Sequence, residues 1–279
     1  MKKIILLLGF LLIANCSAFA NCEYTCVEPY DMNNKFMSVM SSITGANFLT
    51  EKVAQSLLKK EFAKVIKGDD LKVSIDSYSS KDLKNGIFKS ASVKGTKLNV
   101  EGVYLSSLEM NTLCNFNYVK QKGNGVVFVE DLPMSVALTM SADDINKTMQ
   151  SDKYKKVIED LNRLGFGGVK ISSTKAEIKS NKFYYTIGVS LPFVKSEKTF
   201  SVTADLKVKN GKIDFDNTRL TSKTFNIDLS KIDYIVNYLN PLDFSMKILD
   251  NKKANVYIKN INISKNIISA DGIAVIPKD

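Results

Sequence analysis

The sequence predicts an α+β protein in which one large, curled antiparallel β-sheet wraps around a long amphipathic helix, with two further helical regions. Three observations predict this class. Many segments alternate apolar and polar side chains, as strands with one wet and one covered face do. A few segments instead repeat apolar residues at spacings of three and four, as one face of a helix does. Neither βαβ alternation nor a glycine-rich phosphate loop is present, so nothing favours a parallel sheet.

Residues 1–20 have the pattern of a secretory signal peptide. Two lysines precede an apolar run at 4–14, and small residues occupy the positions before the expected cleavage after Ala20. The run is well short of the roughly 20 residues that cross a bilayer. Lipidation of Cys16 remains an alternative, although the residue before it is not the small one that this modification requires. We therefore expect an exported protein, periplasmic or extracellular.

The segment 21–44 carries Cys22 and Cys26, and Cys114 lies further along the chain. In an oxidising compartment the two nearby cysteines could pair, and we expect a disulfide between Cys22 and Cys26. Free thiols are the alternative. A zinc site fits poorly, because the mature chain offers neither a fourth Cys nor a His.

Residues 45–279 are expected to form a single α+β domain, opened by a helix at 50–67. Thr50 precedes the apolar repeat and Gly68 follows it, as residues at the two ends of a helix do. At about 1.5 Å per residue this helix is roughly 27 Å long, enough to lie along the trough of a curled sheet. Its apolar face consists of Ala54, Leu57, Leu58, Phe62, Val65 and Ile66.

The acidic pair Asp143 and Asp144 could belong to a calcium loop, to an acid/base pair or to the start of a helix. An EF-hand loop beginning at Asp144 would need Gly and Glu where Met149 and Lys155 stand. The sequence does not indicate a second carboxylate that would complete a glycosidase acid/base pair. Ser141 and Asp144 instead form a capping box, with both charges at the positive end of the helix dipole. We therefore expect a helix start.

Two further helical regions follow the same logic. The helix after Ser141 extends to Leu164 with a break near Ser151. Its apolar positions are Ile145, Met149, Tyr154, Val157, Ile158, Leu161 and Leu164. Ser230 with Asp233 predicts another capping box and a helix that stops at Pro241. Its apolar positions are Ile232, Ile235, Val236 and Leu239.

Six segments alternate as strands: 71–78, 97–105, 182–193, 199–208, 212–220 and 255–263. Asn210-Gly211 is a two-residue hairpin signal, and Asn181 marks a similar reversal.

The absence of His excludes the commonest general base and metal ligand, and with it Ser-His-Asp and Cys-His catalysis. No arrangement of the remaining carboxylates, lysines and tyrosines suggests an enzyme. We therefore expect no catalytic residues, no metal and no cofactor.

A curled sheet that leaves part of its trough unfilled offers an apolar cavity for acyl chains. The residues expected to line it are Leu57, Leu58, Phe62, Ile145, Met149, Ile235 and Leu239. These residues are first of all core residues. If they fill the trough, the protein is instead a scaffold or adhesion module of the envelope.

The net charge of +10 would favour peripheral contact with anionic lipid headgroups. The lysines are nevertheless spread over polar faces, as ordinary solvated lysines are. Nucleic acid is not an expected partner, since the sequence shows neither a basic helix nor an aromatic platform.

The order of elements resembles the LmeA-like phospholipid-binding family of exported bacterial proteins. The corresponding segments are "LKNGIFKSASVKGTKLNVEGVYLSSLEMNT" (83–112), "VALTMSADDINKTM" (136–149), "IDYIVNYLNPLDF" (232–244) and "VYIKNINISKNIISADGIAVI" (256–276). The family's closing proline-glycine turn is missing here, because a Lys-rich stretch follows Pro241. Over 45–276 the resemblance implies a fold similar to tubular lipid-binding proteins. It also implies an envelope protein that binds or shuttles phospholipid, and it carries over no catalytic residue.

Overall fold

The computed structural model describes residues 26, 46–68, 70–122, 125–164, 168–222, 235–251 and 253–279. The expected signal peptide, Cys16, Cys22 and the capping pair of Ser230 and Asp233 lie outside the described residues.

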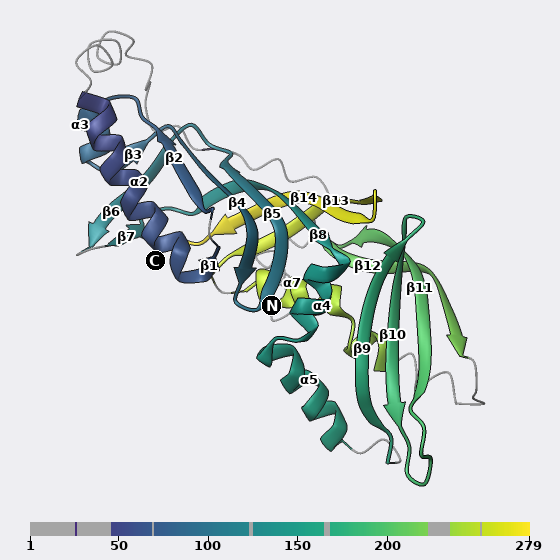
Figure 1. Ribbon diagram of the computed structural model, residues 1–279. Helices are drawn as coiled ribbons and strands as arrows, with labels where there is room; N and C mark the ends of the chain where they lie inside the picture. Colours follow the sequence, from purple (N-terminus) through teal and green to yellow (C-terminus); the bar gives the residue numbers. More distant parts are fainter. Residues whose placement is uncertain are drawn as a thin grey trace, which may run out of the picture.

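The protein is mostly antiparallel β-sheet with a few helices, so the α+β class is confirmed at this level. The strands in the described part of the chain are divided among three sheets, however, and do not form one large sheet. Figure 1 shows the seven-stranded sheet and the small three-stranded sheet towards one end of the molecule and the four-stranded sheet at the other.

The seven-stranded sheet has the order β1-β4-β5-β8-β14-β13, with β2 also paired to β4. Its strands are β1 (Ile66–Lys67), β2 (Lys72–Asp76), β4 (Ser90–Val100), β5 (Val103–Thr112), β8 (Leu132–Ser141), β13 (Asn255–Ser264) and β14 (Ile267–Ile276). The four-stranded sheet contains β9 (Lys170–Lys179), β10 (Lys182–Ser190), β11 (Lys198–Lys209) and β12 (Lys212–Ser222). The three-stranded sheet contains β3 (Ile87–Phe88), β6 (Asn117–Lys122) and β7 (Gly125–Phe128). The helices are α2 (Ala46–Val65), α3 (Ser80–Lys84), α4 (Ala142–Met149), α5 (Asp152–Arg163) and α7 (Pro241–Leu249), and 235–238 are also helical.

The seven-stranded sheet separates apolar from polar side chains across its two faces. Leu108 of β5 pairs with Leu138 of β8, and two residues further along β5 Met110 pairs with Val136. These four side chains share a face and are buried. The intervening positions Ser107, Glu109, Ala137 and Thr139 lie on the opposite face. One face of this sheet is therefore available to a core or a cavity.

The predicted single strand 97–105 is wrong, because the chain reverses within it. β4 ends at Val100, β5 begins at its partner Val103, and Glu101 and Gly102 form the two-residue turn between them. Both turn residues have positive φ, 51° and 102°, as tight hairpin turns require. A glutamate at the first position is an uncommon signal for such a turn, since residues with a Cβ seldom adopt this conformation.

The turns at Asn181 and at Asn210-Gly211 are confirmed, with positive φ at all three residues. The second turn joins the two ends of the molecule, because the N–H of Ile258 in β13 donates to the carbonyl of Gly211 over 2.8 Å. A side chain at Gly211 would collide with the ring of Tyr257.

The predicted first helix is present as α2, which begins four residues earlier than expected. Leu58 and Phe62 are buried, whereas Val53 is 62% exposed. The helix contacts β1, β2, β7 and α3. It therefore packs beside one end of the seven-stranded sheet, next to the small sheet (Figure 1).

The capping box at Ser141 is confirmed. The Ser141 hydroxyl accepts a hydrogen bond from the Asp144 N–H over 3.2 Å, and the Asp144 carboxylate accepts from the Ser141 N–H over 2.9 Å. The break at Ser151 is also confirmed, since this residue caps α5. Asp144 is buried and also accepts a hydrogen bond from the Ser106 hydroxyl of β5. The acidic pair therefore begins a helix and ties it to the sheet.

Helix α4 connects the two larger sheets. The Tyr104 N–H of β5 donates to the Thr148 hydroxyl over 2.9 Å. The Asn146 side-chain amide donates to the Ala176 carbonyl of β9 and accepts from its N–H, over 2.8 and 2.9 Å. Asn162 of α5 makes the same pair of bonds with Ile171 of β9. Two asparagines therefore satisfy backbone groups along the edge of the four-stranded sheet.

Pro241 does not end the helical region as predicted but begins α7. Its missing N–H costs nothing in the first turn, and the Asn240 side chain accepts from the N–H groups of Leu242 and Asp243. The preceding helical turn at 235–238 ends before the proline.

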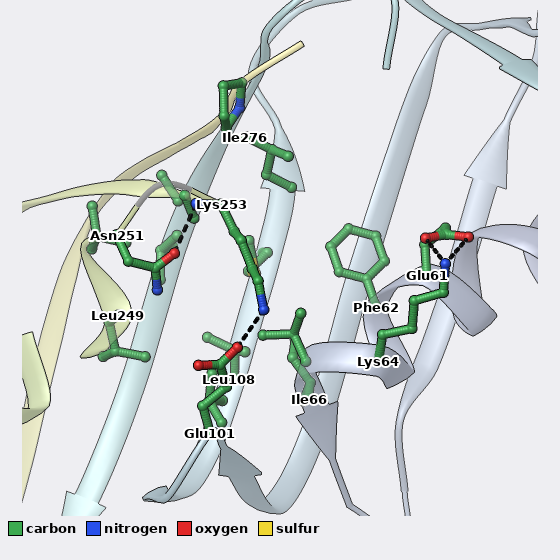
Figure 2. Close-up of a pocket in the computed structure, with 18 of the residues that line it drawn as sticks. Glu61, Phe62, Lys64, Ile66, Glu101, Leu108, Leu249, Asn251, Lys253 and Ile276 are labelled. Atoms are coloured by element: carbon green, nitrogen blue, oxygen red, sulfur yellow. Dashed lines mark hydrogen bonds and ion pairs between the residues drawn. The ribbon is translucent and has the colours of Figure 1, made fainter. Parts of the chain in front are cut away.

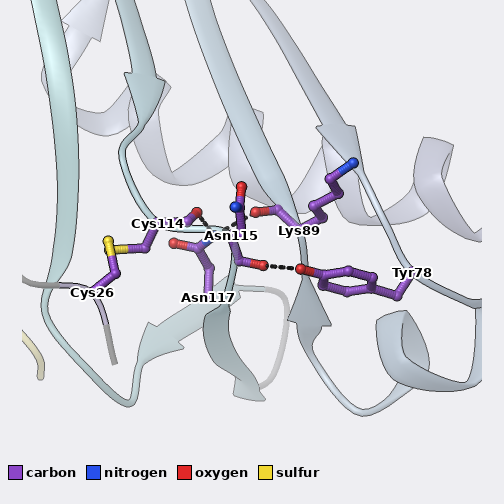
Figure 3. The surroundings of a disulfide bond; sticks show 6 residues. All are labelled: Cys26, Tyr78, Lys89, Cys114, Asn115 and Asn117. Atoms are coloured by element: carbon purple, nitrogen blue, oxygen red, sulfur yellow. Dashed lines mark hydrogen bonds between the residues drawn. A yellow bond between two sulfur atoms is a disulfide. The ribbon is translucent and has the colours of Figure 1, made fainter. Parts of the chain in front are cut away.

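The predicted disulfide between Cys22 and Cys26 is wrong, because Cys26 is bonded to Cys114 (Figure 3). The two residues are 88 positions apart in the chain, with Cα atoms 5.4 Å apart. The buried Asn117 side chain holds the Cys114 loop by donating to the carbonyls of Cys114 and Lys89, each over 2.9 Å. The disulfide therefore fastens Cys26 to the loop after β5.

Candidate functional site

A cavity of about 460 Å³ lies against the apolar face of the seven-stranded sheet, between the last turn of α2 and the end of α7. Figure 2 shows side chains from these elements converging on it. Most of its wall is aliphatic or aromatic: Phe62, Val65, Ile66, Val100, Leu105, Leu108, Met110, Val126, Phe128, Val136, Leu138, Ile248, Leu249, Ala254, Val256, Ala274, Ile276 and Pro277. Such a surface excludes water and accepts hydrocarbon.

The remaining wall is charged or polar and consists of Glu61, Lys64, Glu101, Asn251, Lys253, Lys278 and Asp279. Glu61 and Lys64 neutralise each other across one helical turn, with the ammonium 2.6 Å from a carboxylate oxygen. The cavity therefore joins an apolar interior to a few charges, as amphiphile sites do.

Glu101 accepts from two lysines that come from distant parts of the chain. The Lys253 Nζ lies 2.6 Å from one carboxylate oxygen, and the Lys153 Nζ of α5 lies 2.9 Å from the other. These hydrogen bonds lower the pKa of Glu101 from its ordinary 4.5 to about 2. Glu101 is therefore a carboxylate at any physiological pH and cannot serve as a general acid.

The last three residues close one side of the cavity. The Asp279 N–H donates to the Phe128 carbonyl over 3.0 Å, and the Asp279 carboxylate accepts from the Phe128 N–H over 2.7 Å. The Lys278 N–H donates to the Asp131 carboxylate over 2.9 Å. These bonds hold the end of the chain against β7.

Of the seven residues predicted to contact lipid, Phe62 lines the cavity. Its neighbour one turn earlier, Leu58, is buried, and Leu57 is half-buried. The other four are buried away from the cavity wall: Ile145, Met149, Ile235 and Leu239. The two helical regions that carry them contribute to the core, and the cavity is built mainly from strands.

The prediction missed the wall residues of β5 and β8. Leu108, Met110, Val136 and Leu138 occur in "YLSSLEMNT" and "LPMSVALTM", which alternate as strands do. That alternation marks one face of a strand as apolar. It does not indicate whether the face meets other side chains or a void.

Two further observations concern metal binding and the buried hydroxyl groups of the described residues. These residues contain no cluster of three or more His, Cys, Asp or Glu side chains arranged to hold a metal ion. The hydroxyls of Tyr154 and Tyr185 lie 2.9 Å apart, and burial raises the pKa of both, so they remain neutral. Tyr154 also donates to the Leu239 carbonyl, so this pair joins core elements.

Comparison of the chain with protein-family models, with curated protein sequences and with solved structures finds no match. The resemblance to the LmeA-like family therefore stays a hypothesis. None of the helices in the described part of the chain combines the length and apolar composition that a membrane crossing needs.

Proposed function

We propose that the protein is exported to the cell envelope, where it binds an acyl-chain lipid such as phospholipid in this cavity without catalysing a reaction. The observation that carries the proposal is the apolar cavity of about 460 Å³. Ligand pockets span roughly 300–1,000 Å³, so this volume suits a small amphiphile or part of a larger lipid. The sequence resemblance to the LmeA-like family supports the same class of ligand.

Hydrocarbon burial supplies enough free energy for such binding. Each methylene removed from water contributes about 0.8 kcal/mol, so ten methylenes contribute roughly 8 kcal/mol before the cost of ordering the chain. Phe62, Leu108 and Leu138 would contact the ligand from α2, β5 and β8. The proposal includes a curled seven-stranded sheet whose trough is bordered by the long helix α2.

Export is supported by two independent features. The first 20 residues carry the signal-peptide pattern described above. The bond between Cys26 and Cys114 is typical of proteins that fold in an oxidising compartment.

The proposal also includes peripheral contact with an anionic membrane surface. In the loop between β10 and β11, Phe193 is fully exposed and Val194 is 39% exposed, and the exposed Lys195 follows them. Leu164, 64% exposed, is the C-cap residue directly after α5. An exposed aromatic beside a lysine suits the interface of an anionic bilayer.

The binding proposal is tested by filling the cavity from the sheet. Ala274 lines the cavity, whereas Ala137 lies on the opposite face of the same sheet and serves as the matched control. We expect Ala274→Leu to lower the affinity for a fluorescent fatty acid and for a labelled phospholipid about tenfold or more, with Ala137→Leu unchanged. Binding is measured by titration of the purified chain, and thermal unfolding confirms that both variants fold.

Equal affinities in the two variants would contradict the proposal. So would the absence of lipid in organic extracts of the purified protein together with no uptake from labelled liposomes. A specific protein partner recovered by cross-linking would then favour the envelope scaffold or adhesion module.

A further inference from the structure

We infer that the cavity selects an amphiphile with an oxyanion head, a carboxylate or a phosphate, and that Lys253 binds this head. The inference rests on the proposed function and adds the charge of the ligand and the residue that recognises it.

Lys253 is placed to meet a head group at the cavity. Figure 2 shows its side chain reaching past the apolar wall to Glu101, with Leu249 and Asn251 to one side and Phe62 and Ile66 to the other. The side chain is 64% exposed, so solvent reaches it as well. A ligand whose tail fills the apolar part would bring its head to this ammonium.

The charges around Lys253 leave a positive excess. Lys253 and Lys153 share one carboxylate, Glu101, so the three side chains carry a net charge of about +1. The Lys253 ammonium has three N–H donors, and within the described residues it has one partner, Glu101. Two donors therefore remain for an oxyanion.

The other charged side chains of the cavity do not reverse this excess. Glu61 is neutralised by Lys64. The Asp279 carboxylate accepts from the Phe128 N–H, and the charge of its neighbour Lys278 offsets it. Lys278 has no ion pair within the described part of the chain.

Exchange of Glu101 for a ligand oxyanion leaves no unpaired charge behind. If Lys253 turns to the ligand, Glu101 keeps its hydrogen bond to Lys153 at 2.9 Å. The ligand head is then bound at the cost of one partly exposed ion pair, which contributes little because solvent screens it. A ligand with an uncharged head would form no new ion pair with Lys253 to replace the one with Glu101.

The test uses the full mature chain with four probes: hexadecanoic acid, hexadecyl phosphate, hexadecanol and inorganic phosphate. Lys253→Met keeps the length and the apolar stem of the side chain but removes its charge. Lys247→Met is the matched control, because Lys247 is a similarly exposed, ion-paired lysine that does not line the cavity. Affinities for the three long-chain probes are measured by displacement of an apolar fluorescent dye, and binding of inorganic phosphate by isothermal titration calorimetry, both at low and high salt.

We expect the wild-type chain to bind the acid and the phosphate ester more tightly than the alcohol. Lys253→Met should weaken the two anionic probes about three- to tenfold, as expected for a partly screened charge, and leave hexadecanol within about twofold. Lys247→Met should leave all three within about twofold, and high salt should weaken the anionic probes alone.

Equal wild-type affinity for the acid and the alcohol would overturn this inference and leave the proposed function standing. An equal loss of affinity for hexadecanoic acid in the two variants would also overturn the inference and leave the proposed function standing. Saturable binding of inorganic phosphate that Lys253→Met abolishes, without binding of the long-chain probes, would show a free-anion site and overturn the inference. Failure of all the long-chain probes to bind would remove the proposed function together with the inference.

Discussion

At the scale of single residues, Asp144 shows how one carboxylate can serve both a helix and a sheet. It closes the capping box with Ser141 and accepts from Ser106, while its neighbour Asp143 is exposed. The sequence was sufficient to predict the capping box, because the spacing is local. The bond to Ser106 is not predictable, since 38 residues separate the two side chains.

Replacing Asp144 with Ala should lower the free energy of unfolding by about 1–3 kcal/mol, because two hydroxyls and an N–H lose their acceptor in a buried setting. The control Asp143→Ala should change it by less than about 0.5 kcal/mol. Urea unfolding followed by circular dichroism measures both values. Equal effects of the two substitutions would contradict the assigned role.

Glu101 provides a prediction about pH. Because its pKa falls from 4.5 in an unfolded chain to about 2 in the folded protein, its ion pairs stabilise the fold fully above pH 4.5. That stability is lost as the pH falls towards 2. The difference in unfolding free energy between the wild type and Glu101→Gln should therefore shrink from up to about 1 kcal/mol at neutral pH to near zero at the acid end.

Urea titrations at several pH values measure this difference for Glu101→Gln and for a control, Glu130→Gln, at an exposed position. The control should show no such dependence. A difference that stays constant for Glu101→Gln between pH 6 and pH 2.5 would show that the lysines contribute nothing to the fold.

At the scale of elements, strands and turns with a clear local signal in the sequence are predicted correctly, whereas features without such a signal are not. The strands β11, β12 and β13 follow from alternation, and the turn at Asn210-Gly211 from its residue pair. The Glu101-Gly102 turn was missed, because glutamate is rare at a position with positive φ. The sequence prediction ends a helix at Pro241, but proline is equally suited to the first turn of a helix, which is where the structure places it.

The disulfide was not predictable, because four cysteines in the sequence allow several pairings and the spacing of Cys22 and Cys26 favours the local one. We expect Cys114→Ser to lower the free energy of unfolding by roughly 2–5 kcal/mol, since the bond closes a long loop. Cys22→Ser should leave it unchanged. Thermal and urea unfolding under oxidising conditions compare the two, and the reverse order would restore the local pairing.

At the scale of the whole molecule, the cavity and the exposed loop lie on different parts of the structure. The cavity belongs to the seven-stranded sheet, and the β10–β11 loop lies at the far end of the four-stranded sheet (Figure 1). Sequence patterns could not place either, because both depend on how the three sheets meet. Membrane contact and ligand binding should therefore be separable by substitution.

Phe193→Ser should reduce sedimentation with anionic phospholipid vesicles by about threefold or more, because it removes the most exposed aromatic ring from the loop. The affinity for a soluble acyl probe should not change. The control is Tyr238→Ser, which also removes an exposed aromatic ring. Phe215 is unsuitable as a control because its ring packs on Phe183. Unchanged vesicle binding of Phe193→Ser would exclude the loop as the contact.

The asparagine pairs on β9 have a consequence for how copies of this protein behave together. A strand at the border of a sheet offers its free N–H and C=O groups as a template for a neighbouring chain. Asn146 and Asn162 occupy those groups at Ala176 and Ile171. The backbone groups of these two residues are thereby unavailable to an added strand, which should hinder copies of the chain from joining edge to edge at this border.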